Sequence, residues 1–567
     1  MATLDEVMAQ RPQQPWVTHP HWFGRAERPL LGWVSLPPDA AVGASGVAVL
    51  PPVGYEWWST HRTLRATAER LARDGHVVLR VDYEGTGDSA GEQYEPDRVA
   101  RWRASAAAAV AELRRLGVER VTLLGLRLGA LIALLDGSEL AADALIAWAP
   151  VTSGRRYARE IRLLADRAPD GAGLPAGTLL NAGSVFRADT LADLAALDVN
   201  RMTAAPAPRV LLVAASPDPG LERRLSGLGS SVTQLTPVDC ERPLSLPAEY
   251  ATVPEQAVGA IDGWLGPSTR SAAGRLAARS AASLRGPNGE ELVEAVIELG
   301  QAGLVAVETR RPELNVGAAT LLLLNSGSEP HVGPGRAWVE YARALAADGH
   351  RCIRADFRGW GESPDDDRAP GRPYDEHCVE DTVALVRALR ERDGGPIVLA
   401  GLCASAWAAL RAVLREPVDG VVALNPQLYW RPGDPVEATM TETRRRRTPE
   451  RRREELGRRL RLWTVLDQLG SRPWSARWLD DLVRTGVPVT LAFACGDDGI
   501  EYLRNRVDRR LRAALRAGTI ELVEIAGIDH SMGRVWLRER IVAVLRARLE
   551  AVGADVAQRA LPAPAGR

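Results

Sequence analysis

The chain has 567 residues, a formal net charge of −1 at pH 7, 46% hydrophobic residues and 25% charged residues. This is a globular composition, and at about 100–200 residues per domain the length predicts three to five domains or two large α/β ones. The charge balance excludes a global attraction to nucleic acid or to an acidic membrane. All 71 basic residues are arginines, which excludes Schiff-base, pyridoxal phosphate and P-loop chemistry because each requires a lysine.

The first half of the chain alternates apolar, β-rich runs with amphipathic helical patterns, which is typical of a parallel sheet with crossover helices. An insertion over about 152–205 interrupts this alternation near the sheet edge where α/β proteins bind ligands, and we expect it to be a helical lid. We therefore predict an α/β fold for this half, as an N-terminal domain over 1–268. Its predicted strands are 47–50, 76–82, 121–125, 144–148 and 209–215.

An Ala-rich linker over 266–290 precedes a second half with the same alternation, which we predict to be a C-terminal domain over 285–555. A helical lid is expected at about 430–485, with ten arginines between 444 and 461. These arginines form either a solvated helix face or a docking patch for an acidic carrier protein or a phosphopantetheine phosphate. The predicted strands of this half are 319–325, 352–356, 396–401, 420–425 and 488–494.

The two halves repeat each other in sequence. DGHVVLRVDYEGTGDSAG in the first half corresponds to DGHRCIRADFRGWGESPD in the second, at an offset of 274 residues. VTLLGLRLGALIAL corresponds to IVLAGLCASAWAAL, and DALIAWAP to DGVVALNP, both at an offset of 276. An offset that drifts by only two residues indicates duplicated whole domains.

The chemistry is predicted to lie in the second half, where a strand, the turn GLCAS (401–405) and a helix follow one another. This is the frame of a nucleophile elbow, G-x-S-x-G, with Cys403 in the central position and a serine in place of the usual last glycine. A helix N-terminus beside the sulfur favours a thiolate. The alternative is a buried structural cysteine, since cysteine is among the most buried residue types.

The order nucleophile, acid, histidine supplies the partners of Cys403. Asp497 and Asp498 follow a late strand, and His530, the last histidine of the chain, follows the next strand. We predict a triad of Cys403, His530 and Asp498, with Asp498 preferred because it corresponds to Asp218 of the first half at an offset of 280. Asp497 remains a competitor for the same role.

An oxyanion hole is predicted from backbone amides beside the elbow. The N–H of Ala404 is the first donor. The second is expected from the loop after an early strand, at Gly327 or Ser328. In the first half the elbow GLRLG (125–129) carries Arg127, which cannot act as a nucleophile, and no histidine follows it before the linker. We expect either a structural pseudo-domain or an anion-binding site at Arg127, and the two are compatible.

These motifs resemble the α/β-hydrolase superfamily, in its serine-aminopeptidase-like branch, through the D-x-x-G-x-G-x-S stretches at 82–89 and 356–363, the elbows and the triad order. NSGSEPHVGPGR and GLCAS of the second half resemble the type 1 hydrolases associated with exosortase A systems, which carry Cys in the elbow. LPPVGYEWWSTHR and GLRLGA of the first half resemble the type 2 members, which carry Arg there. The resemblance implies two tandem α/β-hydrolase domains.

The Cys elbow is also similar to that of the acyl-shuttling transferases of nonribosomal peptide and polyketide pathways, although those are not tandem. An acyl-cysteine is itself a thioester, so exchange with a carrier thioester is nearly isoenergetic. We therefore expect a biosynthetic acyltransferase that takes acyl groups from thioesters of a carrier protein or of CoA. The alternatives are a thioesterase or esterase with the same triad, and a non-catalytic scaffold protein.

The remaining expectations concern location and cofactors. The five cysteines form no CxxC pair, and an odd number in a long chain is typical of a reducing compartment. The N-terminus has no signal-peptide pattern, and no apolar run reaches the roughly 18 residues of a membrane span. We expect a cytoplasmic protein without membrane insertion, metal, organic cofactor or nucleic-acid partner.

Overall fold

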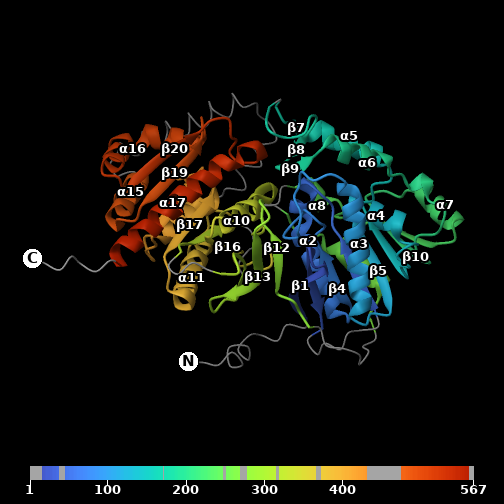
Figure 1. The fold of residues 1–567 in the computed structure, drawn as a ribbon. Coiled ribbons are helices and arrows are strands. Elements are labelled where there is room, and N and C mark those ends of the chain that lie inside the picture. The colour runs from blue at the N-terminus through green and yellow to red at the C-terminus, as the bar shows by residue number, and fades with distance from the viewer. Residues whose placement is uncertain are drawn as a thin grey trace, which may run out of the picture. The chain divides into compact units, whose positions relative to one another are not determined.

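The computed structural model describes residues 16–37, 45–169, 171–246, 251–268, 277–313, 318–365, 372–430 and 474–560 (Figure 1). The chain divides into two compact units, Met1–Val296 and Ile297–Arg567. The division falls inside a strand, Glu291–Leu299, and so lies later in the chain than the expected linker.

The first unit contains an eight-stranded sheet in the order β1-β2-β4-β3-β5-β6-β10-β11. Strands β1 and β2 form an antiparallel hairpin, β2 joins β4 in an antiparallel pairing, and the others pair in parallel. The strands are β1 (Val17–Arg25), β2 (Arg28–Leu36), β3 (Ser45–Leu50), β4 (Val77–Val81), β5 (Arg120–Leu126), β6 (Ala144–Trp148), β10 (Arg209–Val213) and β11 (Ser231–Leu235).

Helices cover both faces of this sheet, which explains why its central strands are continuous apolar runs. On one face α3 (Arg98–Arg115) and α4 (Leu128–Asp136) pack into the larger core cluster. On the other face α2 (Tyr55–Arg73) and α9 (Glu255–Leu265) pack into a second cluster. The short helices α7 (Pro219–Gly227) and α8 (Arg242–Ser245) lie in later connections.

The insertion of the first unit is not purely helical, which corrects the expectation of a helical lid. It contains α5 (Gly154–Leu164), α6 (Ala188–Ala196) and a 3₁₀ turn, η1 (Val199–Arg201). Between α5 and α6 lies a three-stranded antiparallel sheet of very short strands, so local hairpin pairing replaces part of the expected helix. These strands are β7 (Asp166–Arg167), β8 (Leu179–Asn181) and β9 (Ser184–Phe186).

The second unit is built on a nine-stranded sheet in the order β12-β13-β14-β16-β15-β17-β18-β19-β20. Its central and C-terminal strands pair in parallel, as in the first unit. The strands are β12 (Ala281–Arg285), β13 (Glu291–Leu299), β14 (Leu304–Arg310), β15 (Thr320–Leu324), β16 (Arg351–Ala355), β17 (Ile397–Leu402), β18 (Gly420–Leu424), β19 (Val489–Ala494) and β20 (Ile520–Ile525).

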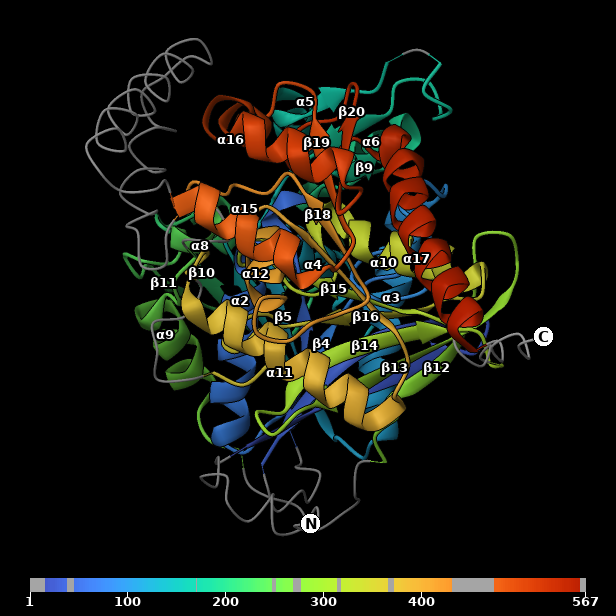
Figure 2. The same ribbon diagram turned by 90° about the vertical axis from the view of Figure 1, so that its left-hand side faces the viewer.

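Both faces of the second sheet are again covered by helices (Figure 2). Helices α11 (Glu376–Asp393) and α12 (Ala404–Ala412) belong to one core cluster, together with α15 (Trp474–Thr485) and α16 (Asp498–Arg516). Helices α10 (Ala337–Ala347) and α17 (Arg538–Ala560) pack on the opposite face. The 3₁₀ turns η3 (Pro334–Arg336) and η4 (Val535–Leu537) precede α10 and α17. The Arg-rich stretch at 444–461 and most of the expected lid lie outside the described residues.

All ten predicted strands are confirmed, each within one or two residues of the observed bounds. The hairpins at the start of the two sheets, β1–β2 and β12–β13, were not predicted because polar residues lie among their apolar ones, and β1 and β2 each also contain a proline. Among the described residues, no helix combines the length and the apolarity needed to cross a bilayer. In the same ranges, no group of three or more His, Cys, Asp or Glu side chains is arranged to hold a metal ion.

Candidate active site

The predicted elbow of the second unit is a tight strand-to-helix turn. Strand β17 ends at Leu402 and α12 begins at Ala404, so Cys403 alone makes the turn, with φ 59° and ψ −110°. A positive φ is strained for a residue with a side chain. The Cys403 N–H donates to the Leu424 carbonyl of β18 at 2.9 Å, which anchors the strained residue to the sheet. The side chain is only partly buried and can meet a substrate.

Small flanking residues make the turn possible. A Cβ on Gly401 would lie 2.6 Å from the backbone carbon of Ser405, so any side chain there collides with the first turn of α12. Ser405 fits in place of the usual glycine, and its hydroxyl accepts a hydrogen bond from the Leu402 N–H at 3.0 Å. Ala404 opens α12, so its N–H has no carbonyl one turn before it to bond to. This geometry is compatible with an oxyanion donor.

His530 lies beside Cys403 and is held by an aspartate. Its Nδ1 is 2.6 Å from Oδ2 of Asp497, and its ring is hydrogen-bonded to the Cys403 side chain. Since Nδ1 is engaged with the carboxylate, Nε2 is the nitrogen left for the sulfur. The Asp497 side chain is 4% exposed, whereas that of His530 is 39% exposed. A buried carboxylate thus orients a more accessible imidazole next to the Cys403 sulfur, as in a catalytic triad.

The charges of this cluster raise the pKa of His530 well above its ordinary value. Desolvation is the largest single influence and lowers the pKa. It is outweighed by the attraction of the Cys403 thiolate, by the hydrogen bonds to Asp497 and Cys403, and by the charge of Asp497. The arrangement therefore favours the protonated form of His530 beside Cys403.

The predicted partner of His530 is corrected, because the carboxylate that contacts His530 is that of Asp497 and not that of Asp498. Asp497 is the N-cap of α16: one carboxylate oxygen accepts the Gly499 N–H at 2.8 Å and the other faces His530. Asp498 is the first residue of the helix itself.

Strand register explains this one-residue error. Leu145 of β6 pairs with Val210 of β10, and its counterpart Val421 pairs with Val489, so the offset between the last strands is 279 and not 280. An offset of 279 places Asp218 opposite Asp497, and both are helix N-caps.

Asn425 holds the histidine loop and was not singled out from the sequence. It follows β18, is fully buried and has a φ of 44°. Its Nδ2 donates to the His530 carbonyl at 2.8 Å, and its Oδ1 accepts the Ala494 N–H at 2.7 Å. One side chain therefore ties the histidine loop to the end of β19. The available signal was the contrast with alanine at the matching position, Ala149, where φ is 42°.

The loop of the predicted second oxyanion donor is anchored by Asp356, the first residue of the second D-x-x-G-x-G-x-S stretch. Its carboxylate accepts the Asn325 side-chain amide at 2.8 Å and the His331 N–H at 2.7 Å, and it faces His331 Nδ1 at 2.6 Å. His331 is 2% exposed, so its side chain is buried and stabilises the loop through its contact with Asp356. Gly327 has a φ of 58° and open space where a Cβ would be. The oxyanion role of Gly327 or Ser328 stays a prediction.

Tyr374 is a further side chain beside Cys403 that the sequence did not indicate. Its hydroxyl lies 3.1 Å from Cys403 Sγ and donates to Gln427 Oε1 at 2.8 Å. Its ring packs against Trp407 and Trp430, with centroids 5.7 and 5.6 Å away. It lies just before α11, in a loop without periodic pattern, so no sequence signal placed it at the site.

The first unit has the same elbow, but its side chains differ from those of the second unit. Arg127 has φ 54° and ψ −113°, and its N–H donates to the Trp148 carbonyl at 3.0 Å, as Cys403 does to the matching Leu424. Its guanidinium, however, bonds to Glu56 at 2.7 Å and to Glu160 at 2.8 Å. Because two carboxylates neutralise this cation, the structure does not support the expected anion site at Arg127.

The residues around Arg127 form a closed cluster. Tyr157 of α5 donates its hydroxyl to Glu56 at 2.8 Å, and the Arg127 guanidinium lies over its ring at 5.5 Å. Burial lowers the pKa of Arg127, but the neighbouring carboxylate of Glu56 outweighs this effect and raises it. The four histidines of this unit all precede the elbow in the sequence, so none occupies the place of His530.

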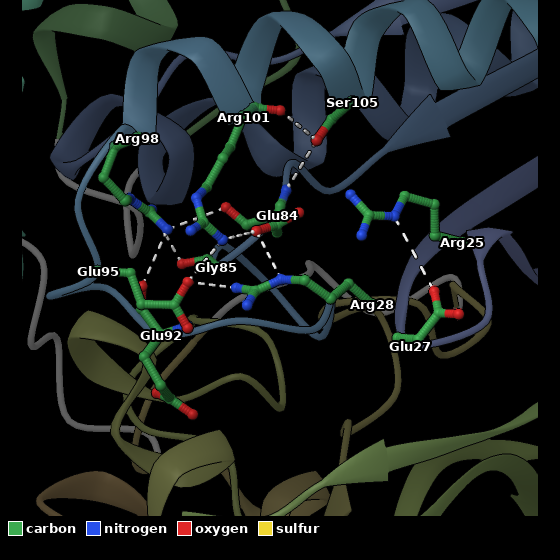
Figure 3. A network of polar contacts seen from close by, with 10 residues as sticks. All are labelled: Arg25, Glu27, Arg28, Glu84, Gly85, Glu92, Glu95, Arg98, Arg101 and Ser105. Carbon is green, nitrogen blue, oxygen red and sulfur yellow. Dashed lines mark hydrogen bonds and ion pairs between the residues drawn. The ribbon is translucent and has the colours of Figure 1, made fainter.

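A charge network fixes the loop of the first D-x-x-G-x-G-x-S stretch (Figure 3). Arg28 and Arg101 each pair with both Glu84 and Glu95. Arg98 is buried and donates to the Glu84 and Gly85 carbonyls at 3.0 and 3.1 Å. The loop is thus held as a rigid element of the unit.

Comparisons with known proteins agree with this fold. The family described as Alpha/beta hydrolase family matches residues 321–555, and the one described as Serine aminopeptidase, S33, matches residues 58–177. No curated protein matches the chain significantly.

Solved structures similar to one half of the chain include Est1E from Butyrivibrio proteoclasticus with ferulic acid bound, at 18% identity and a TM-score of 0.33, covering 43% of this chain and 97% of that one. A thioesterase domain from the curacin biosynthetic pathway matches at 16% identity and a TM-score of 0.29, covering 45% and 98%. An α/β serine hydrolase homologue from Coxiella burnetii matches at 17% identity and a TM-score of 0.27, covering 44% and 96%. By the two family models, each half of the chain contains one region similar to a hydrolase family.

Proposed function

We propose that the C-terminal region is an acyltransferase that carries its acyl group on Cys403 and takes it from a thioester of a carrier protein or of CoA. The observation that supports this most is the cysteine at the strained elbow, hydrogen-bonded to an imidazole that Asp497 holds from behind. The hydrolase regions in both halves are compatible with acyl-transfer chemistry.

In the first step His530 Nε2 takes the thiol proton and Cys403 Sγ attacks the thioester carbonyl. The Ala404 N–H, with an amide of Gly327 or Ser328, is placed to stabilise the oxyanion. The tetrahedral intermediate collapses as the bond from the carbonyl carbon to the leaving sulfur breaks. The leaving thiolate takes the proton from the His530 imidazolium, so an acyl-cysteine and a free thiol remain.

In the second step His530 deprotonates an acceptor thiol, alcohol or amine, which attacks the acyl-cysteine. The bond between the acyl carbon and Sγ breaks, and the electron pair returns to sulfur. A thioester donor and an acyl-cysteine have similar free energies, so the exchange is reversible. This energetic match suits reversible acyl transfer, and a thioesterase uses the same steps with water as acceptor.

The test is intact-protein mass spectrometry after incubation with a panel of acyl-pantetheine and acyl-carrier thioesters. We expect a mass gain equal to the acyl group that is absent in Cys403→Ala, with transfer slowed on the order of 10⁴–10⁶-fold. The lifetime of the adduct with and without acceptor separates transferase from thioesterase. Thioester turnover that persists in Cys403→Ala would contradict the proposal.

A further inference from the structure

We propose that the Tyr374 hydroxyl donates a hydrogen bond to the Cys403 thiolate and is therefore a catalytic residue, stabilising the negative charge on sulfur whenever the acyl group arrives or leaves. The distance of 3.1 Å from the hydroxyl oxygen to Sγ lies within hydrogen-bonding range for sulfur. The inference rests on the proposed function only in taking Cys403 as the nucleophile.

The tyrosine is held in place at some conformational cost. Its φ of 64° is an outlier for a bulky residue, and its side chain is almost completely buried. Strain of this kind persists only where the surrounding structure imposes it, and it clusters at functional sites. Trp407 and Trp430 provide that surrounding, because the tyrosine ring packs between their rings. Trp407 Nε1 is in turn bonded to the Trp430 carbonyl at 3.0 Å.

The Tyr374 hydroxyl can donate its hydrogen bond to either of two neighbours, Gln427 Oε1 or Cys403 Sγ. Its proposed role follows from a change between these two acceptors. Gln427 Oε1 accepts from Tyr374 at 2.8 Å and also from Trp430 Nε1 at 3.0 Å. While Cys403 is a thiol, its S–H can donate to the tyrosine oxygen and the tyrosine proton stays on Gln427. Once the sulfur carries a negative charge, the tyrosine proton turns to it, because hydrogen bonds to charged acceptors are the stronger ones. Gln427 keeps its bond from Trp430, so the exchange leaves no buried group unsatisfied.

Both transfer steps pass through the Cys403 thiolate, which is the species that Tyr374 stabilises. Attack starts from the thiolate, and departure of the acyl group returns an electron pair to Sγ. The tyrosine keeps its proton throughout, because burial in the first place, and then the charge of Cys403, raise the pKa of Tyr374 well above its ordinary value. The contribution is therefore a hydrogen bond alone, with no proton transfer.

The loop that carries Tyr374 distinguishes the two halves. Helices α3 and α11 have the same length of 18 residues and occupy corresponding positions. The segment from Ser89 to the start of α3 is four residues shorter than the segment from Ser363 to the start of α11. In the first half the short loop is held by the arginine–glutamate network, and in the second half the longer loop brings a tyrosine to the nucleophile.

The experiment measures the alkylation rate of Cys403 by iodoacetamide from pH 5 to 9, read on the Cys403 peptide by mass spectrometry so that the exposed Cys495 does not interfere. In the full-length Tyr374→Phe variant we expect the midpoint of the pH profile to rise by about one unit, which is about a tenfold lower rate below the midpoint. Gln427→Leu removes the competing acceptor and should shift the midpoint downward.

Matched controls keep the inference falsifiable. Tyr341→Phe removes another buried hydroxyl of this unit, one without a hydrogen-bond partner among the described residues, and should leave the midpoint unchanged. If Tyr374→Phe alkylates with the wild-type midpoint, or if Gln427→Leu shifts it upward, the inference is overturned. A shifted midpoint together with no acyl adduct in the wild type would uphold the role of Tyr374 and reject the acyltransferase. An acyl adduct with an unshifted midpoint would do the reverse.

Discussion

The elbows of the two halves have nearly the same backbone conformation, but they carry and contact different side chains. Cys403 and Arg127 differ by 5° in φ and 3° in ψ, and each donates its N–H to the end of the neighbouring strand. The strained turn is therefore imposed by the passage from a buried strand into a helix. The reaction depends on which side chain occupies that turn, so a strained elbow by itself does not indicate an enzyme.

The surroundings of the two elbows differ as much as the central residues do. Around Cys403 the structure places an imidazole, its carboxylate and a tyrosine hydroxyl. Around Arg127 it places Glu56 and Glu160, which form ion pairs with the guanidinium and neutralise its charge. The comparison indicates that the first half retains its turn as structure, with an ion-pair cluster where a substrate would sit.

The largest expected effect tests which aspartate acts as the acid in the proposed reaction of the second half. Asp497→Asn should lower the rate of acyl-cysteine formation on the order of 10³–10⁴-fold, because an amide can hold the wrong tautomer of His530 and cannot stabilise its imidazolium. Asp498→Asn, one residue away, should change the rate only a few-fold. Single-turnover kinetics with one acyl thioester measure both, and a larger effect of Asp498→Asn would restore the acid predicted from sequence.

The next effect concerns the last position of each elbow. A Cβ on Gly129 would lie 2.0 Å from the Leu50 carbonyl oxygen, so Gly129→Ala should destabilise the first half by about 3 kcal/mol. Ser405→Gly removes only the hydroxyl bond to the Leu402 N–H and should cost about 1 kcal/mol. Denaturant unfolding measures both. Equal costs would show that the two turns are more alike than their contacts indicate.

A smaller effect tests whether Arg127 is structural. Arg127→Ala leaves Glu56 without its cation and should lower the free energy of unfolding by about 1–3 kcal/mol, less than for a fully buried pair because Glu160 is 46% exposed. The acyl adduct on Cys403 should form as before. Arg25→Ala is the matched control, since Arg25 and Glu27 are both 77% exposed and 4.0 Å apart, and it should have no measurable effect. A stable Arg127→Ala protein would favour a binding role for the guanidinium.

The smallest expected effect is a change in the pKa of His530 when Cys403 is replaced. In Cys403→Ala the thiolate is gone, so the pKa of His530 should fall from its raised value toward the ordinary one. NMR of the His530 imidazole, with its signal assigned from the His530→Gln variant, measures this change in pKa. An unchanged pKa would show that the Cys403 sulfur does not raise the pKa of the histidine.

Most strands and part of the site could be predicted because they follow from patterns of residues that are close together in the sequence. Buried parallel strands appear as apolar runs, and the small residues at 401 and 405 mark the tight turn. Cys403 and His530 follow from the order of motifs along the chain. The acid was misplaced by one residue because an offset counted along the sequence does not detect residues gained between strands, whereas strand register does.

The remaining features depend on contacts between distant segments. Tyr374 reaches Cys403 from a loop without pattern, and Asn425 acts through the carbonyl of a residue 105 positions away. The glutamates around Arg127 come from α2 and α5, which the elbow sequence does not specify. Local patterns show that a polar residue is present, but only the folded chain shows which partner it meets.

The strand registers also record how the two halves arose. The offset between corresponding strands is 276 before the insertion, at β6 and β18, and 279 after it, at β10 and β19. Two segments of some 60 residues thus differ in length by only three. Insertions acquired independently would not be expected to match so closely. The matched lengths therefore favour a common ancestor of both halves that already carried an insertion at this place.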